Sequence, residues 1–419
     1  MRTSVASRSA DPRLPARRAI EALRYGVPSR DAVAALGSGQ NDVEDRLVAL
    51  LERCGTTRAG GNRGLLLGGG FGSGKSHVLN HLGHLALGRG FAVSSVVVSK
   101  ETPLHDPGKV LRAAVESATM PDGALDAVAE AASSLDPDSP AFAELLRWAS
   151  GPAVDERFAL TLSLLPRVQA SDGDFAEAIV RFWSGDPIGV AELRRHARAA
   201  GEGRPALAAV PARELAVQRF RFLARLFVAA GSDGWLVMLD EVELIGRYSL
   251  LQRGRAYAEL AGWLRPDAED RGSPLVPVLA MTDDFDAAVL TARNDREQVP
   301  SRLRAKQTPE WAEVASRAEL GMRFIERDTV LLAPPDGQEL DRTYRRIQAL
   351  HGEAFGWDPP DVAGLERLGT TRMRQYVRAW INEWDLIRLD PAYRPETEAV
   401  DLELGYWEEP ELEGNGPGK

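Results

Sequence analysis

A glycine-rich octapeptide, GGFGSGKS at residues 69–76, constrains this chain more than any other feature of its sequence. It matches the pattern G-x-x-x-x-G-K-[ST], in which glycines let the backbone curl around phosphate and point consecutive N–H groups inward. A short apolar run (residues 64–70) precedes it, and a helical pattern, SHVLNHLGHLAL, follows it. A strand, a glycine loop and a helix in this order predict a phosphate-binding loop, or P-loop, at the amino end of the helix.

The residues of this loop have distinct expected roles. The Lys75 ammonium is expected to reach the terminal phosphates of ATP, and the Ser76 hydroxyl to be a Mg²⁺ ligand. Lysine occurs at only five positions of a chain that otherwise uses arginine, which indicates that position 75 needs a compact ammonium. A dinucleotide site is less favoured, because a Lys-Ser pair ends the loop and no ribose-binding acid follows. The predicted nucleotide-binding residues are Gly69, Gly70, Phe71, Gly72, Ser73, Gly74, Lys75, Ser76 and His77.

Continuous apolar runs recur along the chain with helical patterns between them. Runs without polar alternation are typical of buried parallel strands, and strands that alternate with helices indicate a sheet covered on both faces. We therefore expect an α/β P-loop NTPase fold with a five-stranded parallel sheet. The predicted strands lie within residues 64–70, 91–99, 235–241, 274–282 and 329–333.

The remaining stretches suggest a division into regions, because helical patterns flank and interrupt the predicted sheet. The gap between the second and third strands is too long for one crossover helix, so it is interpreted as a helical insertion. Eight acids against one base after residue 395 predict an unstructured tail. The expected regions are an N-terminal helical module (1–63), a P-loop core (64–335, insertion about 107–232), a helical lid (336–390) and the tail (391–419).

Two carboxylates follow the third predicted strand, at the sheet edge where such folds bind ligands. Asp240 is expected to hold Mg²⁺, and Glu241 to polarise the attacking water, so that Glu241 and Lys75 are the candidate catalytic residues. The metal ligands would be Ser76 and Asp240. A solvated acidic turn is the alternative interpretation, and the preceding P-loop makes it the weaker one.

Candidate sensor residues follow the fourth strand and lie in the expected lid. Thr282 ends an apolar strand, where a polar side chain contacts the γ-phosphate in ATPases with extra strands, although it could equally cap the strand. Arg374, on a predicted lid helix with Arg378 four residues on, could reach the phosphates. A finger arginine for a neighbouring subunit could come from Arg302, Arg304, Arg317 or Arg323.

Composition narrows the class of protein. A net charge of −10 and a pI near 5.3 disfavour non-specific nucleic-acid binding, so a DNA contact would need a local basic patch. No apolar run approaches the ~20 residues of a membrane-spanning helix. The N-terminal stretch lacks the apolar segment of a secretory signal, and the single cysteine excludes an internal disulfide, so a cytoplasmic location is expected.

Together, GGFGSGKS, WLVMLDE, the Thr282 strand and MRFIERDTVLLAPPDGQELDRTYRRI resemble AAA+ ATPases of the replication-initiator (ORC/Cdc6-like) branch. More narrowly, ARRAIEALRYGVPSRDAVAALGSGQ, VVVSKETPLHDPGKV and MRQYVRAWINEWDL are similar to the BREX phage-defence ATP-binding (BrxD-like) family. The resemblance implies an ATP-dependent role in a multiprotein bacterial defence complex, with action on DNA through partners. AMTDDF departs from the AAA+ pattern, because it lacks the Asn often found at the sensing position.

The sequence thus predicts a Mg²⁺-dependent ATPase that works as a homo-oligomer or with other defence proteins. The alternative is an ATP-dependent switch or scaffold that hydrolyses little or no ATP and docks partners through its helical insertion. A small-molecule P-loop kinase is less favoured, because no catalytic lid follows soon after the core.

Overall fold

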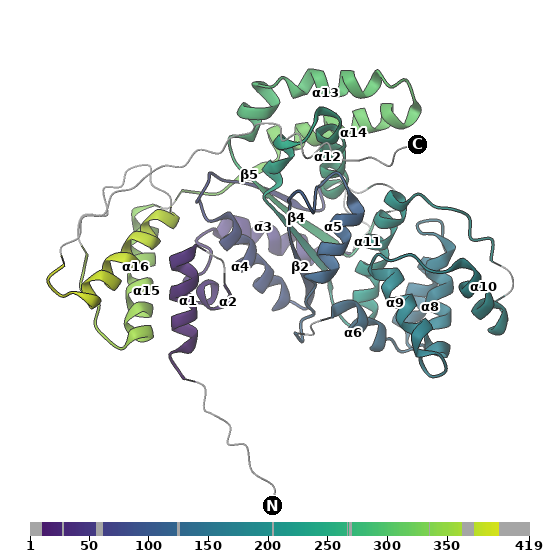
Figure 1. Ribbon diagram of the computed structural model, residues 1–419, viewed down its shortest axis with the longest axis horizontal. Coiled ribbons are helices and arrows are strands. Elements are labelled where there is room, and N and C mark those ends of the chain that lie inside the picture. Colours follow the sequence, from purple (N-terminus) through teal and green to yellow (C-terminus); the bar gives the residue numbers. More distant parts are fainter. Residues whose placement is uncertain are drawn as a thin grey trace, which may run out of the picture. The chain divides into compact units, whose positions relative to one another are not determined.

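The computed structural model describes residues 11–26, 29–55, 62–123, 126–202, 205–265, 267, 270–334, 336–362 and 373–393 (Figure 1). The chain forms two compact units. Among the described residues, the sheet unit comprises Val43–Gly68 and Leu85–Leu331, and the terminal unit comprises residues 11–42, Gly69–His84 and residues 332–393. The predicted acidic tail lies outside the described residues from position 394 onward.

Five parallel strands form the sheet, in the order β2-β3-β4-β1-β5. Every residue of β1, β3 and β4 is buried, which is why these strands appear in the sequence as apolar runs without alternation. The predicted α/β class and all five predicted strands are confirmed. The strands are β1 (Leu65–Gly68), β2 (Phe91–Val97), β3 (Gly234–Asp240), β4 (Leu275–Met281) and β5 (Thr329–Leu331).

The register places the carboxyl ends of the central strands at one edge of the sheet. Gly68, the last residue of β1, pairs with Met281 of β4. Val97, at the end of β2, pairs with Asp240 of β3. Strand β4 lies between β1 and β3, so its carboxyl end lies between the carboxyl ends of these two strands.

The stretch between β2 and β3 folds into helices, several of which begin at a side-chain cap. The carboxylates of Asp106, Asp126, Asp155 and Asp172 accept backbone N–H groups in the first turns of their helices, as N-caps do. These helices share a buried aromatic core. They are α5 (Pro107–Glu116), α6 (Ala127–Ser133), α7 (Pro140–Ala149), α8 (Glu156–Gln169), α9 (Gly173–Ser184), α10 (Val190–Ala199) and α11 (Ala212–Ala229).

Aromatic side chains fill the centre of these helices. The rings of Phe158 and Phe222 lie 5.0 Å apart, and Trp183 lies 5.1 Å from Phe222. The indole N–H of Trp183 donates to the hydroxyl of Thr161 at 2.9 Å, so its polar atom is satisfied in the core. These side chains of α8, α9 and α11 belong to the same buried hydrophobic cluster as the strands, which includes Trp235 of β3.

Short irregular helices follow the carboxyl ends of β3 and β4. After β3 come η1 (Val242–Arg247), a 3₁₀ helix, and α12 (Leu250–Leu264). After β4 come η2 (Asp286–Thr291), a π-helical turn, then α13 (Asp295–Arg304) and α14 (Pro309–Arg327). Helices α12 and α14 pack so closely that a Cβ atom at Gly321 would lie 2.0 Å from the carbonyl oxygen of Tyr257. Figure 1 shows α12, α13 and α14 gathered together (green).

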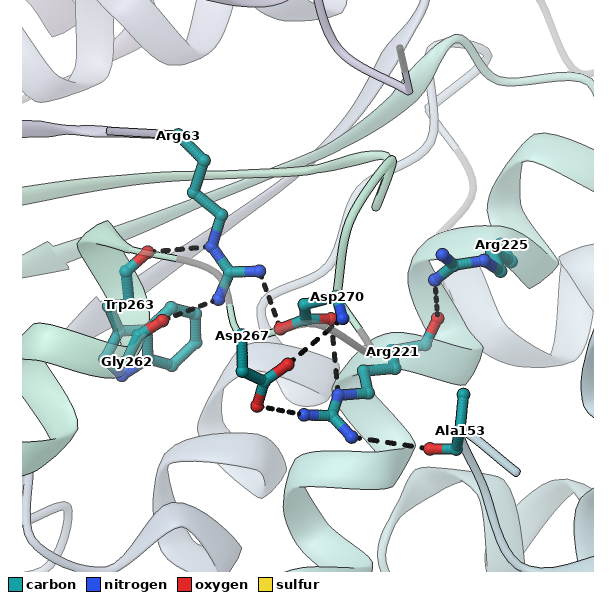
Figure 2. Close-up of polar contacts among 8 residues, drawn as sticks. All are labelled: Arg63, Ala153, Arg221, Arg225, Gly262, Trp263, Asp267 and Asp270. Carbon is teal, nitrogen blue, oxygen red and sulfur yellow. Dashed lines mark hydrogen bonds and ion pairs between the residues drawn. The ribbon is translucent and has the colours of Figure 1, made fainter. Parts of the chain in front are cut away.

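An ion-pair cluster ties together the segments that enter the sheet at its amino edge (Figure 2). Arg63, two residues before β1, pairs with Asp270 at 2.8 Å and donates to the carbonyls of Gly262 and Trp263 at the end of α12. Arg221 of α11 pairs with Asp270 at 3.3 Å and with Asp267 at 2.6 Å. Residues from three parts of the chain thus meet at the edge opposite to the carboxyl ends of the strands.

The terminal unit is built from helices near both ends of the chain. Helices α1 (Leu14–Tyr25), α2 (Arg30–Leu36), α15 (Gly337–Phe355) and α16 (Met373–Leu389) lie side by side (Figure 1). Tyr376, Trp380 and Trp384 of α16 are buried in their shared core. The remaining helices are α3 (Asn41–Glu52) and α4 (Lys75–Leu87), and a boundary between the units falls within each of them.

No helix among the described residues is long and apolar enough to cross a membrane.

Candidate nucleotide-binding site

The predicted P-loop follows β1 directly and belongs to the terminal unit. The ammonium of Lys75 donates to the carbonyl oxygens of Gly69 and Gly70, at 2.7 and 3.3 Å. Only 8% of Lys75 is exposed, so its charge lies inside the loop rather than in solvent. The loop therefore wraps around the one lysine that the sequence places in it.

Two of the loop glycines cannot be replaced without strain or crowding. Gly74 has φ +97°, a left-handed conformation that side chains rarely adopt. A Cβ at Gly69 would lie 2.6 Å from the hydroxyl oxygen of Ser73. These positions need glycine because the backbone turns tightly, as a loop that wraps a phosphate must.

Helix α4 begins at Lys75 and has no acidic residue in its first turn. Its first N–H groups and its helix dipole thus favour an anion. Ser76 is in this first turn, and its carbonyl accepts from the Asn80 side chain at 2.8 Å. The hydroxyl of Ser76 is an oxygen donor of the kind that Mg²⁺ prefers.

His77 connects this helix to the N-terminal helices of the same unit. Its Nε2 lies 2.6 Å from the carbonyl oxygen of Gly37, which ends α2. Burial lowers the pKa of His77, although the bond to Gly37 opposes this effect. A neutral ring can donate through Nε2, and it then holds the Gly37 carbonyl against the first turn of α4.

Arg374 lies against the loop from the start of α16. Its backbone N–H donates to the Gly72 carbonyl at 3.4 Å, and its guanidinium is 5.8 Å from the ring centre of Phe71. The guanidinium also donates to the carbonyl of Gly26, at the end of α1, at 3.0 Å. The structure thus brings Arg374 together with the loop, whereas Arg378 on the same helix is exposed.

The predicted acidic pair lies at the carboxyl end of β3 in the sheet unit. Asp240 is 7% exposed, and its carboxylate accepts the backbone N–H of Glu241 at 2.9 Å. The carbonyl of Asp240 accepts from Val98, just beyond β2, at 2.9 Å. Asp240 is therefore held at the sheet edge, while the side chain of Glu241 is exposed.

Glu241 has a strained backbone, with φ 58° and ψ 34°. This left-handed conformation costs a non-glycine residue about 1–2 kcal/mol. Such residues persist only where the surrounding structure holds them, and they are concentrated at functional sites. Among the described non-glycine residues, Leu207, Asn294 and Gln307 also have a positive φ.

Thr282 directly follows β4, the strand between β1 and β3. It is 4% exposed, and the exposed Asp283 and Asp284 come next in the chain. The Cα of Asp283 lies 3.9 Å from where a Cβ of Gly68 would be. Within the sheet unit, the carboxyl ends of β1, β3 and β4 thus lie at one edge of the sheet.

The family model described as BREX system ATP-binding protein BrxC/D matches residues 12–287. The chain belongs to this family. The matched range holds the loop, Asp240, Glu241 and Thr282, whereas α15, α16 and Arg374 lie beyond it. Comparison with curated proteins and with solved structures found no significant match.

Membership of this BrxC/D family supports ATP binding in a BREX system, and it confirms the resemblance to the BREX ATP-binding family. Sequence reasoning missed several residues that surround the predicted ones. The carbonyls of Gly26 and Gly37 carry no side-chain signal, although a glycine after a helix marks each turn. The buried pair of Arg253 and Asp295 gave no signal either, because each is an ordinary residue of a helical pattern.

Proposed function

We propose that this chain is an AAA+-type ATPase that hydrolyses ATP to ADP and phosphate within a BREX system. Lys75 and the N–H groups of the loop bind the phosphates, and His77 and Arg374 support the loop from within the terminal unit. Glu241 orients and polarises the attacking water. The observation that carries this proposal is the strained conformation of Glu241 at the carboxyl edge of the sheet.

The donor set suits Mg²⁺. Ser76 offers a hydroxyl and Asp240 a carboxylate, which are hard oxygen ligands, and neither site contains the thiolate or imidazole set that zinc prefers. When bound with ATP, Mg²⁺ would neutralise phosphate charge. Asp240 is buried, and its carboxylate is held in place by the Glu241 N–H and the sheet. Its side chain would therefore lose little conformational entropy when a cation binds.

Arg374 is the sensor candidate with the best support, because it already contacts Gly72 of the loop. The polar Thr282 keeps its proposed role as a second sensor, since β4 lies between β1 and β3 and Thr282 directly follows β4. Both roles require that the side chains respond to the terminal phosphate.

Of the four candidates for a finger arginine, we prefer Arg302 and Arg323, because the other two have contacts within the chain. Arg304 is held by Glu319 through two bonds of 2.8 and 2.9 Å, and Arg317 lies next to Gly262. Arg302 and Arg323 are exposed on α13 and α14. We propose that the chain acts as a homo-oligomer or with other BREX components, and that Arg302 or Arg323 completes the site of a neighbour.

The test is ATP hydrolysis as a function of protein concentration, with nucleotide binding measured in parallel. Glu241→Gln should bind ATP as wild type does and lose hydrolysis by at least about 100-fold. Glu101→Gln, at another exposed acid beyond the end of β2, should change neither. A rate that rises more than linearly with concentration and falls in Arg302→Ala or Arg323→Ala supports a shared site. Tight binding without turnover in wild type, alone and with partners, would contradict the enzymatic proposal and leave the switch.

A further inference from the structure

A buried ion pair joins α12 to α13 in the sheet unit. Arg253 binds Asp295 through two bonds, Nε to Oδ2 at 2.8 Å and Nη2 to Oδ1 at 2.9 Å. The side chains are 3% and 0% exposed. The hydroxyl of Tyr257, one turn along α12, donates to the same carboxylate at 2.7 Å. Removing two charges from water is costly, so a pair this deeply buried is a poor source of stability and a good source of fixed geometry.

The pair holds the end of the segment that begins at Glu241. The remaining guanidinium nitrogen of Arg253, Nη1, donates to the carbonyl of Tyr248 at 2.7 Å. Tyr248 ends η1, the six-residue helix that starts immediately after Glu241. Its hydroxyl accepts the backbone N–H of Leu104, in the loop after β2, at 3.3 Å. Arg253 therefore fixes one end of a short, hydrogen-bonded segment whose other end is Glu241.

The same pair also holds the segment that follows Thr282. Asp295 begins α13, and Asn294 before it has φ 54°. Asparagine tolerates this left-handed conformation better than most residues, and here it turns the chain so that Asp295 enters the core. Arg293, the residue before Asn294, donates to the carbonyl of Gly246 in η1. The chain after β4 is thus bonded to the chain after β3 at two places.

A strained residue keeps its conformation only if both of its flanks are fixed. The sheet fixes the flank of Glu241 that ends in Asp240, since β3 pairs with both β2 and β4. The other flank is η1, in which Val242 and Ile245 are fully buried and Tyr248 is bonded to Arg253. If Arg253 released Tyr248, η1 could shift and Glu241 could return to an ordinary conformation.

We propose that Arg253, Asp295 and Tyr257 are positioning residues for Glu241. They hold η1 so that the Glu241 carboxylate stays where water is activated, and they link that position to the segment after Thr282. This inference rests on the proposed role of Glu241 in hydrolysis. The hydrogen bonds described for the network all lie around η1 and the start of α13, so we expect it to set the turnover rate and to leave ATP affinity unchanged.

The chain offers a matched control at the opposite edge of the same sheet. Arg63 and Asp270 form a second, partly buried Arg–Asp pair in which Arg63 also donates to backbone carbonyls, with side chains 14% and 9% exposed. This pair precedes β1 and β4, and the hydrogen bonds and ion pairs of its two side chains among the described residues go to α11 and the end of α12 rather than to η1. Arg63→Lys and Asp270→Asn therefore report the effect of weakening a buried pair without moving Glu241.

The experiment measures kcat, ATP affinity and thermal unfolding of the full chain, with any partner it requires. The variants are Tyr257→Phe, Arg253→Lys and Asp295→Asn, with wild type and Glu241→Gln as references. Tyr257→Phe keeps the ion pair and is expected to fold. It therefore tests the positioning role even if Arg253→Lys and Asp295→Asn fail to fold. We expect kcat to fall about 3-fold in Tyr257→Phe and at least 10-fold in Arg253→Lys and Asp295→Asn, because displacements near 1 Å are costly for catalysis. ATP affinity should stay within 2-fold, and the control variants should unfold earlier but keep kcat within 2-fold.

Hydrogen exchange of the peptide that covers residues 241–248 gives a readout that does not need activity. Exchange there should rise in Tyr257→Phe and not in Arg63→Lys. Wild-type kcat and unchanged exchange in Tyr257→Phe would overturn the positioning role, as would an equal loss of kcat in the control variants. If wild type hydrolyses no faster than Glu241→Gln, the proposed function itself fails, and this outcome is distinct from the others.

Discussion

The backbone N–H of Glu241 donates to the carboxylate of Asp240 at 2.9 Å, while Glu241 itself is in the left-handed region at φ 58°. The buried acid at the end of β3 thus stabilises the strained turn that presents the exposed acid. Under the proposed function, the strain at Glu241 and the hydrolysis of ATP should depend on the same residue, and both can be measured.

Glu241→Gly should stabilise the protein, because glycine adopts the left-handed conformation without a steric cost. The relief of about 1–2 kcal/mol is partly offset by the entropy that glycine loses on folding, which leaves a gain of about 0.5–1 kcal/mol. Hydrolysis should be lost at the same time. Denaturant unfolding would measure the free energy of unfolding, which should rise in Glu241→Gly and stay at the wild-type value in Glu241→Gln. Glu101→Gly, at an exposed residue without positive φ, should instead destabilise, and the same sign for both glycine variants would contradict the strain argument.

Lys75→Arg should lose ATP binding even though it keeps the positive charge. The Lys75 ammonium lies between the carbonyls of Gly69 and Gly70, and a planar guanidinium is too wide for that place. We expect at least a 10-fold loss in affinity, which corresponds to about 1.4 kcal/mol. Isothermal titration with ATP and Mg²⁺ would measure it. Lys109→Arg, at an exposed lysine in the first turn of α5, should bind ATP normally.

Arg374→Ala should uncouple α16 from the loop. It removes the bond to the Gly26 carbonyl and the guanidinium beside Phe71, while the backbone contact with Gly72 remains. We expect kcat/KM for ATP to fall about 10-fold, equivalent to one charged hydrogen bond. Arg378→Ala, one turn further along α16 and exposed, is the matched control. Equal activity of the two variants would remove Arg374 from the sensor candidates.

Acidification should destabilise the sheet unit through His105. Burial lowers the pKa of His105 to about 4, and its ring packs edge-on against Tyr248 at 5.0 Å. Because the folded pKa lies below the unfolded value of about 6.5, the unfolded state binds the proton first. The contribution of His105 is thus complete above pH 6.5 and declines as the pH falls towards 4.

At pH 5 this loss amounts to about 2 kcal/mol. His105→Phe keeps an aromatic ring against Tyr248 and has no proton to bind. Urea unfolding of wild type and His105→Phe at pH 7 and pH 5 would isolate the effect from the titration of carboxylates. The two proteins should differ in how much stability they lose between these pH values, and parallel losses would show that His105 does not titrate in this range.

Much of the fold could be predicted from local signals. Each buried strand is an unbroken apolar run, so its position follows from the local sequence pattern. Ser29 accepts the N–H of Ala32 as a helix cap, and Gly26 ends α1 in the left-handed conformation, as their residue types indicated. The family match extends this reasoning to ATP binding in a BREX system.

The candidate site could be predicted only where its residues are close together in the sequence. The loop is one continuous motif, and Asp240 and Glu241 are neighbours at the end of a strand, so their residue types and spacing carry the hypothesis. The contact of Arg374 with Gly72 and Gly26 joins segments separated by hundreds of residues. No local pattern distinguishes Arg374 from the other arginines of α16 before the helices pack.

The sequence by itself determined the α/β class, the five strands, the glycine loop and the family, because local backbone preferences and apolar periodicity act over a few residues. Only the tertiary structure decided the order of the strands, the left-handed turn at Glu241 and the pairing of Arg253 with Asp295 across 42 residues. Burial is the physical reason. A charged side chain joins a buried pair, and a residue accepts backbone strain, only when distant segments pack around it and supply what the local chain cannot.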